Sequence, residues 1–268
     1  MGELDEAALD AAMSDDPDDT MALIADLTAA TDPALRDLAR RLAGRLFLDV
    51  SRRGPVRPRG IGKIVEMRYR PDGGDLDLDA SLDALVAAGA GAVDPEQLRI
   101  RGWAKPGTAL CLLVDRSGSM GGKPLAASAV AAAAVSYWAP NDYSVVAFGK
   151  DIVVAKSQDA HTSSDKVVNA VLALRGFGTT DLSGALQTAA DQLSRSRAGR
   201  KIVVVLSDCR ATVDGDPVAA GRLLDEVVVI APDGDSDEAL VFARQCGARM
   251  ATASGPTGVV EALGSLLQ

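Results

Sequence analysis

The chain has 268 residues, enough for one large domain or for one domain with an extension. Its formal net charge of -9 argues against a nucleic-acid-binding protein, because binding to phosphates needs a basic surplus. The 3 cysteines lie far apart without a C-x-x-C pair, so neither a disulfide framework nor a zinc site is indicated. No stretch approaches 18 consecutive apolar residues, and the N-terminus lacks the pattern of a secretory signal. We therefore expect a cytoplasmic protein without a membrane span.

Residues 1–104 are predicted to form a small, mainly helical extension. In chain order, the expected elements are a frayed or weakly helical stretch over 1–13, helices over 21–28 and from Asp32-Pro33 onward, a strand over 64–69, a helix over 81–88 and a strand over 97–101. Residues 52–70 carry seven basic residues against one acid. This basic segment is expected to be either a solvated loop or a contact for an acidic surface, including the acidic N-terminus of the chain itself.

From about residue 105 the pattern changes to short apolar runs that alternate with helical stretches. The runs, rich in Val, Leu and Ile, cover 110–114, 145–148, 202–206 and 227–231. The helical stretches cover 124–138, 164–174, 182–195, 216–224, 236–246 and 257–267. Runs this short and apolar suit strands that are buried on both faces. The alternation predicts an α/β domain over 105–268, with a doubly wound, mostly parallel central sheet flanked by helices.

Polar side chains follow two of these runs where the strands end. Asp115 comes directly after the run over 110–114, and Asp208 comes two residues after Leu206. In open parallel sheets ligands bind beyond the carboxyl ends of the strands, so both carboxylates are expected at the same edge. A Gly-rich turn that includes Thr180 opens a helix and can reach that edge. Such oxygen donors favour Mg²⁺ or Mn²⁺, although Asp and Ser are also ordinary turn and cap residues.

The loop that contains Asp115 resembles the first loop of the metal-ion-dependent adhesion site in von Willebrand factor A domains. Thr180 resembles the metal-binding threonine of the second loop, and Asp208 the acid of the third. The resemblance implies a site made of five residues: Asp115, Ser117, Ser119, Thr180 and Asp208. It further implies that the site holds Mg²⁺, with Mn²⁺ possible, and that an Asp or Glu of a partner protein completes the coordination.

The third loop departs from the family pattern, because Cys209 stands where a glycine is usual. We expect Cys209 to be a buried small residue rather than a reactive thiol. The sole histidine, His161, falls in a polar stretch and is expected to be an exposed loop residue. No general base is therefore predicted near the metal loops.

Residues 75–82 and 98–101, upstream of the first metal loop, are similar to the segment before the A domain in D-type subunits of magnesium and cobalt chelatases. They also resemble stand-alone A-domain proteins that work with MoxR-type AAA+ ATPases. The resemblance implies a non-enzymatic adaptor of such an ATPase, acting in protein remodelling or metal-cofactor insertion. Two alternatives stay open: a magnesium-dependent phosphohydrolase with Asp115 as its nucleophile, and an extracellular adhesion protein.

Overall fold

The structure is a computed structural model that describes residues 6–28, 63–68, 75–88, 98–104, 107–116, 122–174, 176 and 178–267, with single positions at 39, 47, 48 and 50. Its internal contacts divide the chain into two units. One unit combines Met1–Pro58 with Thr108–Gln268, and the other is Arg59–Gly107. The division predicted from the sequence, 1–104 and 105–268, stays a proposal.

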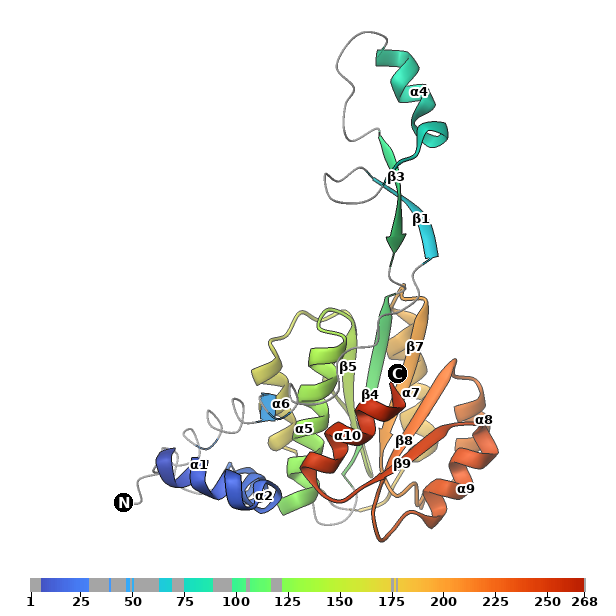
Figure 1. The fold of residues 1–268 in the computed structure, drawn as a ribbon. Coiled ribbons are helices and arrows are strands. Elements are labelled where there is room, and N and C mark those ends of the chain that lie inside the picture. The colour runs from blue at the N-terminus through green and yellow to red at the C-terminus, as the bar shows by residue number, and fades with distance from the viewer. Residues whose placement is uncertain are drawn as a thin grey trace. The chain divides into compact units, whose positions relative to one another are not determined.

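The larger unit contains a six-stranded sheet in the order β6-β5-β4-β7-β8-β9 (Figure 1). Its strands are β4 (Thr108–Asp115), β5 (Tyr143–Phe148), β6 (Ile152–Lys156), β7 (Arg200–Leu206), β8 (Glu226–Pro232) and β9 (Arg249–Ala253). All neighbouring pairs are parallel except β5 with β6, which is antiparallel. The prediction of a mostly parallel α/β sheet is therefore confirmed.

Helices cover both faces of this sheet. They are α5 (Gly122–Trp138), α6 (Ser164–Leu172), α7 (Leu182–Ser194), α8 (Pro217–Arg222), α9 (Asp237–Cys246) and α10 (Pro256–Leu266). Leu110, Leu112 and Val114 of β4 point into a core shared with α5, α6 and α10. The alternate residues Cys111 and Leu113 point into a second core shared with α7 and α9. Both faces of each central strand are buried, which is why these strands appear in the sequence as continuous apolar runs.

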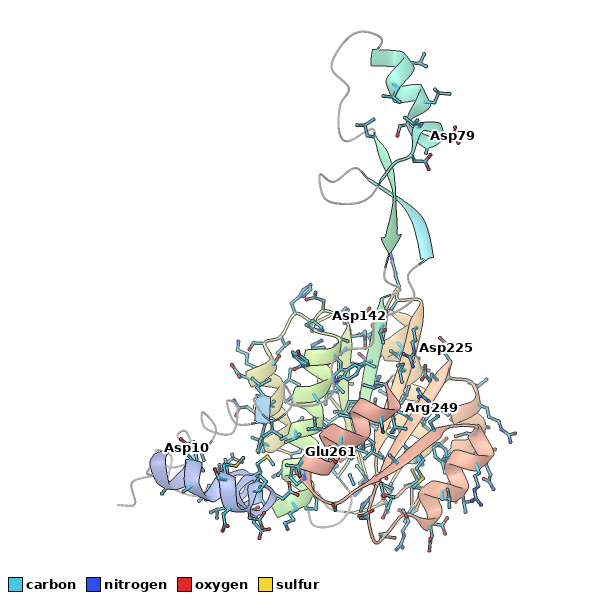
Figure 2. The ribbon with its side chains drawn as sticks, in the orientation of Figure 1. Asp10, Asp79, Asp142, Asp225, Arg249 and Glu261 are labelled. Atoms are coloured by element: carbon cyan, nitrogen blue, oxygen red, sulfur yellow. The ribbon has the colours of Figure 1, made fainter. Side chains whose placement is uncertain are left out.

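Two N-terminal helices, α1 (Glu6–Asp15) and α2 (Pro17–Leu27), belong to the same unit as the sheet. Met21, Ile24 and Ala25 of α2 are buried in the core that α5 and α10 also line. Helices of this unit carry exposed charged side chains, such as Asp10 on α1 and Glu261 on α10 (Figure 2). Among the described helices, none is both long and apolar enough to cross a membrane.

The smaller unit is a three-stranded antiparallel sheet with one helix. Its strands are β1 (Lys63–Arg68), β2 (Asp75–Leu76) and β3 (Arg99–Ala104), in the order β1-β3-β2, and its helix is α4 (Leu78–Ala88). The strands predicted at 64–69 and 97–101 and the helix predicted at 81–88 all correspond to elements of this unit. The helix predicted from Asp32-Pro33 onward, and most of the basic segment before residue 63, lie outside the described residues.

In the six-stranded sheet, two strands were not predicted from the sequence, β6 and β9. Both lie at the edges of the sheet, where one side of the strand has no neighbour. Val153 and Val154 of β6 are about 40% exposed, and β9 has an exposed or half-exposed residue at every position. Because an edge strand does not need apolar residues throughout, β9 forms no recognisable apolar run, whereas β6 contains the short run over 152–155, a strand signal that the sequence prediction does not include.

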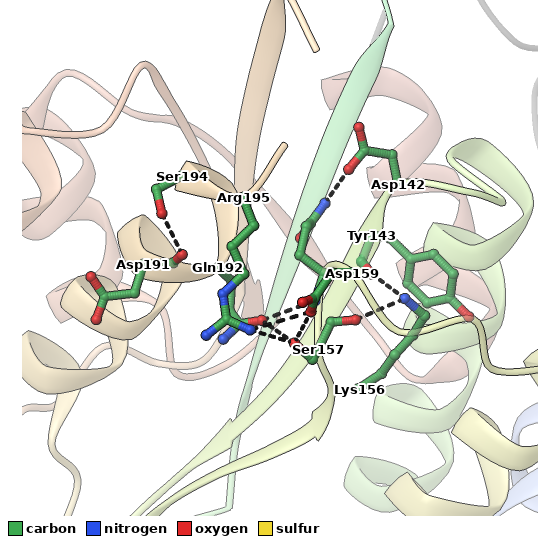
Figure 3. Close-up of polar contacts among 10 residues, drawn as sticks. Asp142, Tyr143, Lys156, Ser157, Asp159, Asp191, Gln192, Ser194 and Arg195 are labelled. Carbon is green, nitrogen blue, oxygen red and sulfur yellow. Dashed lines mark hydrogen bonds and ion pairs between the residues drawn. The ribbon is translucent and has the colours of Figure 1, made fainter. Parts of the chain in front are cut away.

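A polar network holds the amino end of β5, at the end of the strand opposite to Phe148 (Figure 3). The Asp142 carboxylate accepts hydrogen bonds from Gln158 Nε2 at 2.6 Å and from Ser196 Oγ at 2.6 Å. Lys156 Nζ, which is almost fully buried, donates to the Tyr143 carbonyl at 2.5 Å. Burial lowers the pKa of this lysine. The network joins β6 and the end of α7 to β5, so we interpret it as structural.

Candidate metal site at the carboxyl edge of the sheet

Asp115 and Ser207 leave the sheet side by side. β4 and β7 are parallel neighbours in which Val114 lies opposite Leu206, so the next residue of each strand emerges at the same edge. There, Ser207 Oγ donates a hydrogen bond to Asp115 Oδ2 at 2.5 Å. The strand register thus brings the predicted first-loop carboxylate into contact with the residue before Asp208.

The turn after β7 is shaped by hydrogen bonds to side chains within it. The Cys209 amide donates to Ser207 Oγ at 2.9 Å, and the Arg210 amide donates to Asp208 Oδ1 at 3.0 Å. Cys209 has φ 60°, the only positive φ at a non-glycine residue in the described part of the chain. This left-handed backbone is a physical reason for a glycine at the equivalent position of related loops. Cys209 is only 6% exposed, and burial raises the pKa of its thiol, as expected for a structural cysteine.

Thr180 lies in the turn that precedes α7 and is only 3% exposed. Its amide donates to Thr212 Oγ1 at 2.7 Å, and the Thr212 amide donates to the Thr180 carbonyl at 3.1 Å. The next residue, Asp181, caps α7 by accepting from the Gly184 amide at 2.8 Å. The Thr180 turn is therefore joined to the segment that follows Asp208, as well as to the start of α7.

Gly149, directly after β5, lies between this turn and the start of the first loop. Its carbonyl accepts from the Asp181 amide at 3.2 Å. A Cβ atom at Gly149 would lie 3.1 Å from Arg116 Cγ and 3.6 Å from the Thr179 carbonyl oxygen. The ends of β4 and β5 and the Thr180 turn thus meet at one edge. Gly149 was not singled out from the sequence, although a glycine directly after a strand is a recognisable turn signal.

A cavity of about 400 Å³ opens at this edge, and Asp115, Ser207 and Asp208 contribute to its wall. Its other lining residues are Lys123, Pro124, Ala127, Ser128, Leu206, Ala231, Pro232, Asp233, Ala253, Ser254, Gly255 and Val259. Thr180 is not among them. Ser117 and Ser119 lie outside the described residues. The structure therefore brings Asp115 and Asp208 to one cavity and places Thr180 in an adjoining turn.

The donors at this edge suit a hard cation. Asp115 and Asp208 offer carboxylate oxygens and Ser207 a hydroxyl oxygen, which are ligand types that Mg²⁺ accepts. Within the described ranges, no group of three or more His, Cys, Asp or Glu side chains could hold a metal ion. A cation bound here would depend on hydroxyl oxygens as well as on acids, and the set of five ligands predicted from the sequence stays a prediction.

One protein-family model matches the central part of this unit. Residues 110–210 match the family model described as von Willebrand factor type A domain. The matched segment is similar to a von Willebrand factor type A domain. It runs from β4 through the turn after β7, and so includes Asp115, Thr180 and Asp208. A comparison with curated proteins found no match.

Several solved structures are similar to part of this chain. Manganese-loaded TRAP protein of Plasmodium vivax is 17% identical with a TM-score of 0.47, over 60% of this chain and 74% of that one. A von Willebrand factor type A protein from Catenulispora acidiphila is 16% identical with a TM-score of 0.48, over 62% of this chain and 43% of that one. An aerotolerance-related membrane protein from Bacteroides fragilis is 16% identical with a TM-score of 0.46, over 60% and 98%.

Proposed function

We propose that the chain is a non-enzymatic, Mg²⁺-dependent protein-interaction module. The observation that carries this proposal is the pair of strand-end carboxylates, Asp115 and Asp208, on the wall of one cavity at the carboxyl edge of the sheet. This edge includes the boundary between β4 and β7, where the strand order reverses direction and where ligands bind in open α/β sheets. Domains of the matched family commonly act as interaction modules.

The ion would be held by Asp115, Ser117, Ser119, Thr180 and Asp208. When bound, it would supply an electrophilic centre whose remaining position accepts a carboxylate oxygen from an Asp or Glu of the partner. The protein's own residues would orient that partner. Asp115 is fixed by Ser207, Asp208 by the following turn, and Thr180 by its two hydrogen bonds with Thr212.

The partner in this proposal is an AAA+ ATPase of the MoxR-like or chelatase-like class, for which the chain would act as an adaptor in protein remodelling or metal-cofactor insertion. The support is the sequence resemblance of residues 75–82 and 98–101. In the structure these residues form parts of β2, α4 and β3 in the smaller unit. That unit would then supply a second contact surface.

A pull-down of the candidate ATPase, in Mg²⁺ or in EDTA, tests the proposal. Wild type should capture the ATPase in Mg²⁺ and lose it in EDTA, and Asp115→Ala should lose it in both. Glu261→Ala, which removes an exposed carboxylate from α10, is the matched control and should behave as wild type. Capture that is the same in every lane would rule out the metal bridge, and a melting curve for Asp115→Ala separates loss of the site from loss of the fold.

A further inference from the structure

Two helices begin beside the cavity at glycines. α5 starts at Gly122, which has φ 54°, and its first turn contributes Lys123 and Pro124 to the cavity wall. α10 follows Gly255, which has φ 91° and has no side chain with which to cap the helix. The first amide groups of a helix have no partner within it, so both helices need acceptors from elsewhere.

Helix α2 supplies an acceptor to each of them. Asp26 Oδ1 accepts from the Gly122 amide at 2.7 Å, and Asp18 Oδ1 accepts from the Thr257 amide at 2.9 Å. A Cβ atom at Gly255 would come within 2.5 Å of Asp18 Oδ2, so a glycine is needed for this close approach. One acidic helix therefore caps two helices that are remote from it in the sequence.

These two hydrogen bonds differ in kind from the ion pair beside them. Asp19 Oδ1 lies 2.6 Å from Lys123 Nζ, but both side chains are more than half exposed, and exposed ion pairs contribute little. A carboxylate that accepts an amide at a helix N-terminus gains from its charge and from the helix dipole. Met21 and Ile24, fully buried in the core, hold α2 in place for these contacts.

The Asp26 contact lies at Gly122, shortly after the predicted metal loop in the sequence. Ser117 and Ser119 lie in the sequence between Asp115 and Gly122. The Asp115 end of this segment is held by β4 and by Ser207. The Gly122 end is held by Asp26, 96 residues away in the sequence.

We propose that α2 is a positioning element of the metal edge: Asp26 fixes the start of α5, and Asp18 the start of α10, where both helices line the cavity that also contains Asp115 and Asp208. The effect on metal binding rests on the proposed function, whereas the effect on α5 does not. Asp26 lies outside residues 110–210, so this positioning contact comes from outside the segment that matches the family model.

The test compares three variants of the full chain with wild type. Asp26→Ala removes the acceptor, Asp26→Asn keeps an oxygen but loses the charge, and Asp15→Ala removes an exposed carboxylate from the neighbouring helix α1. Hydrogen exchange of the amides in 122–128 reports on the start of α5. Titration with Mn²⁺ alone, monitored by electron paramagnetic resonance, reports on metal binding at this edge.

In Asp26→Ala, we expect the amide hydrogens at the start of α5 to exchange about tenfold faster than in wild type. We also expect this variant to bind Mn²⁺ roughly tenfold more weakly. Asp26→Asn should fall between Asp26→Ala and wild type, and Asp15→Ala should match wild type. Ile24→Val, which loosens the packing of α2 but keeps the carboxylate, separates positioning from general loss of stability. It should lower the melting temperature without weakening Mn²⁺ binding in proportion.

The outcomes separate this inference from the proposed function. If wild type fails to bind Mn²⁺, the proposed metal site is wrong, and hydrogen exchange alone decides whether Asp26 positions α5. Unchanged exchange at 122–128 in Asp26→Ala overturns the inference whatever the metal does. The inference would also be overturned if Ile24→Val weakened Mn²⁺ binding as much as Asp26→Ala does. The loss of Mn²⁺ affinity would then follow the stability of the fold, not the Asp26 carboxylate.

Discussion

Cys209 offers a quantitative check on the backbone geometry of the site. Its φ of 60° places it in the left-handed region, where a side chain with a Cβ atom costs about 1–2 kcal/mol relative to glycine. Replacing Cys209 by Ala keeps this cost, and replacing it by Gly removes the cost. However, Gly also loses a buried methyl group and gains freedom in the unfolded chain, so a single pair of variants would mix three effects.

A second buried cysteine allows these effects to be separated. Cys111 lies in the middle of β4, is fully buried, and has no left-handed backbone. The loss of the methyl group and the gain of unfolded-state entropy are similar at the two positions and cancel when they are compared. The free energy of unfolding of the Gly variant minus that of the Ala variant should therefore be about 1–2 kcal/mol higher at position 209 than at position 111.

Urea denaturation of the four variants measures this difference, provided that the slopes of the unfolding curves agree. We expect Ala to be clearly more stable than Gly at position 111. At position 209 the two should be close, or Gly should be the more stable. An equal preference for Ala at both positions would refute the left-handed geometry of the turn that carries Asp208.

Two further predictions concern the stability of the larger unit. Gly184→Ala should lose about 1–2 kcal/mol in urea denaturation, because the new Cβ would lie 2.5 Å from Asp181 Oδ2, the second oxygen of the carboxylate that caps α7 through Oδ1. Gly234→Ala, with open space around the new atom, should stay within about 0.5 kcal/mol of wild type, and equal losses in both variants would contradict this reasoning. Arg200, and secondarily Arg249 (Figure 2), hold the pKa of Glu226 below its ordinary value of 4.5. The carboxylate therefore stabilises the fold above this value, and the stabilisation is lost as the pH falls through the lower folded-state pKa. The melting temperature of wild type should be higher than that of Glu226→Gln at neutral pH, and the difference should shrink in acid. A difference that does not change with pH would count against the pairing of Glu226 with the arginines.

The sequence predicts the central sheet well because of how that sheet is buried. β4, β7 and β8 are covered by helices on both faces, so nearly every position along them is apolar, and their ends are visible where the apolar run stops. Asp115 and Asp208 could be placed at one edge for the same reason, since parallel strands present their carboxyl ends together. The edge strand β9 was not predicted because Arg249 and Thr252 interrupt its apolar residues.

What joins these elements into a site depends on contacts between residues that are distant in the sequence. The hydrogen bond from Ser207 to Asp115 spans 92 residues, and that from Gly122 to Asp26 spans 96. Local patterns carry no information about such pairs, because an Asp at the end of a strand or within a helix looks the same with or without a distant partner. The sequence by itself determined the fold class and the two strand-end acids. Only the tertiary structure decided that the N-terminal helix α2 caps the helices beside them.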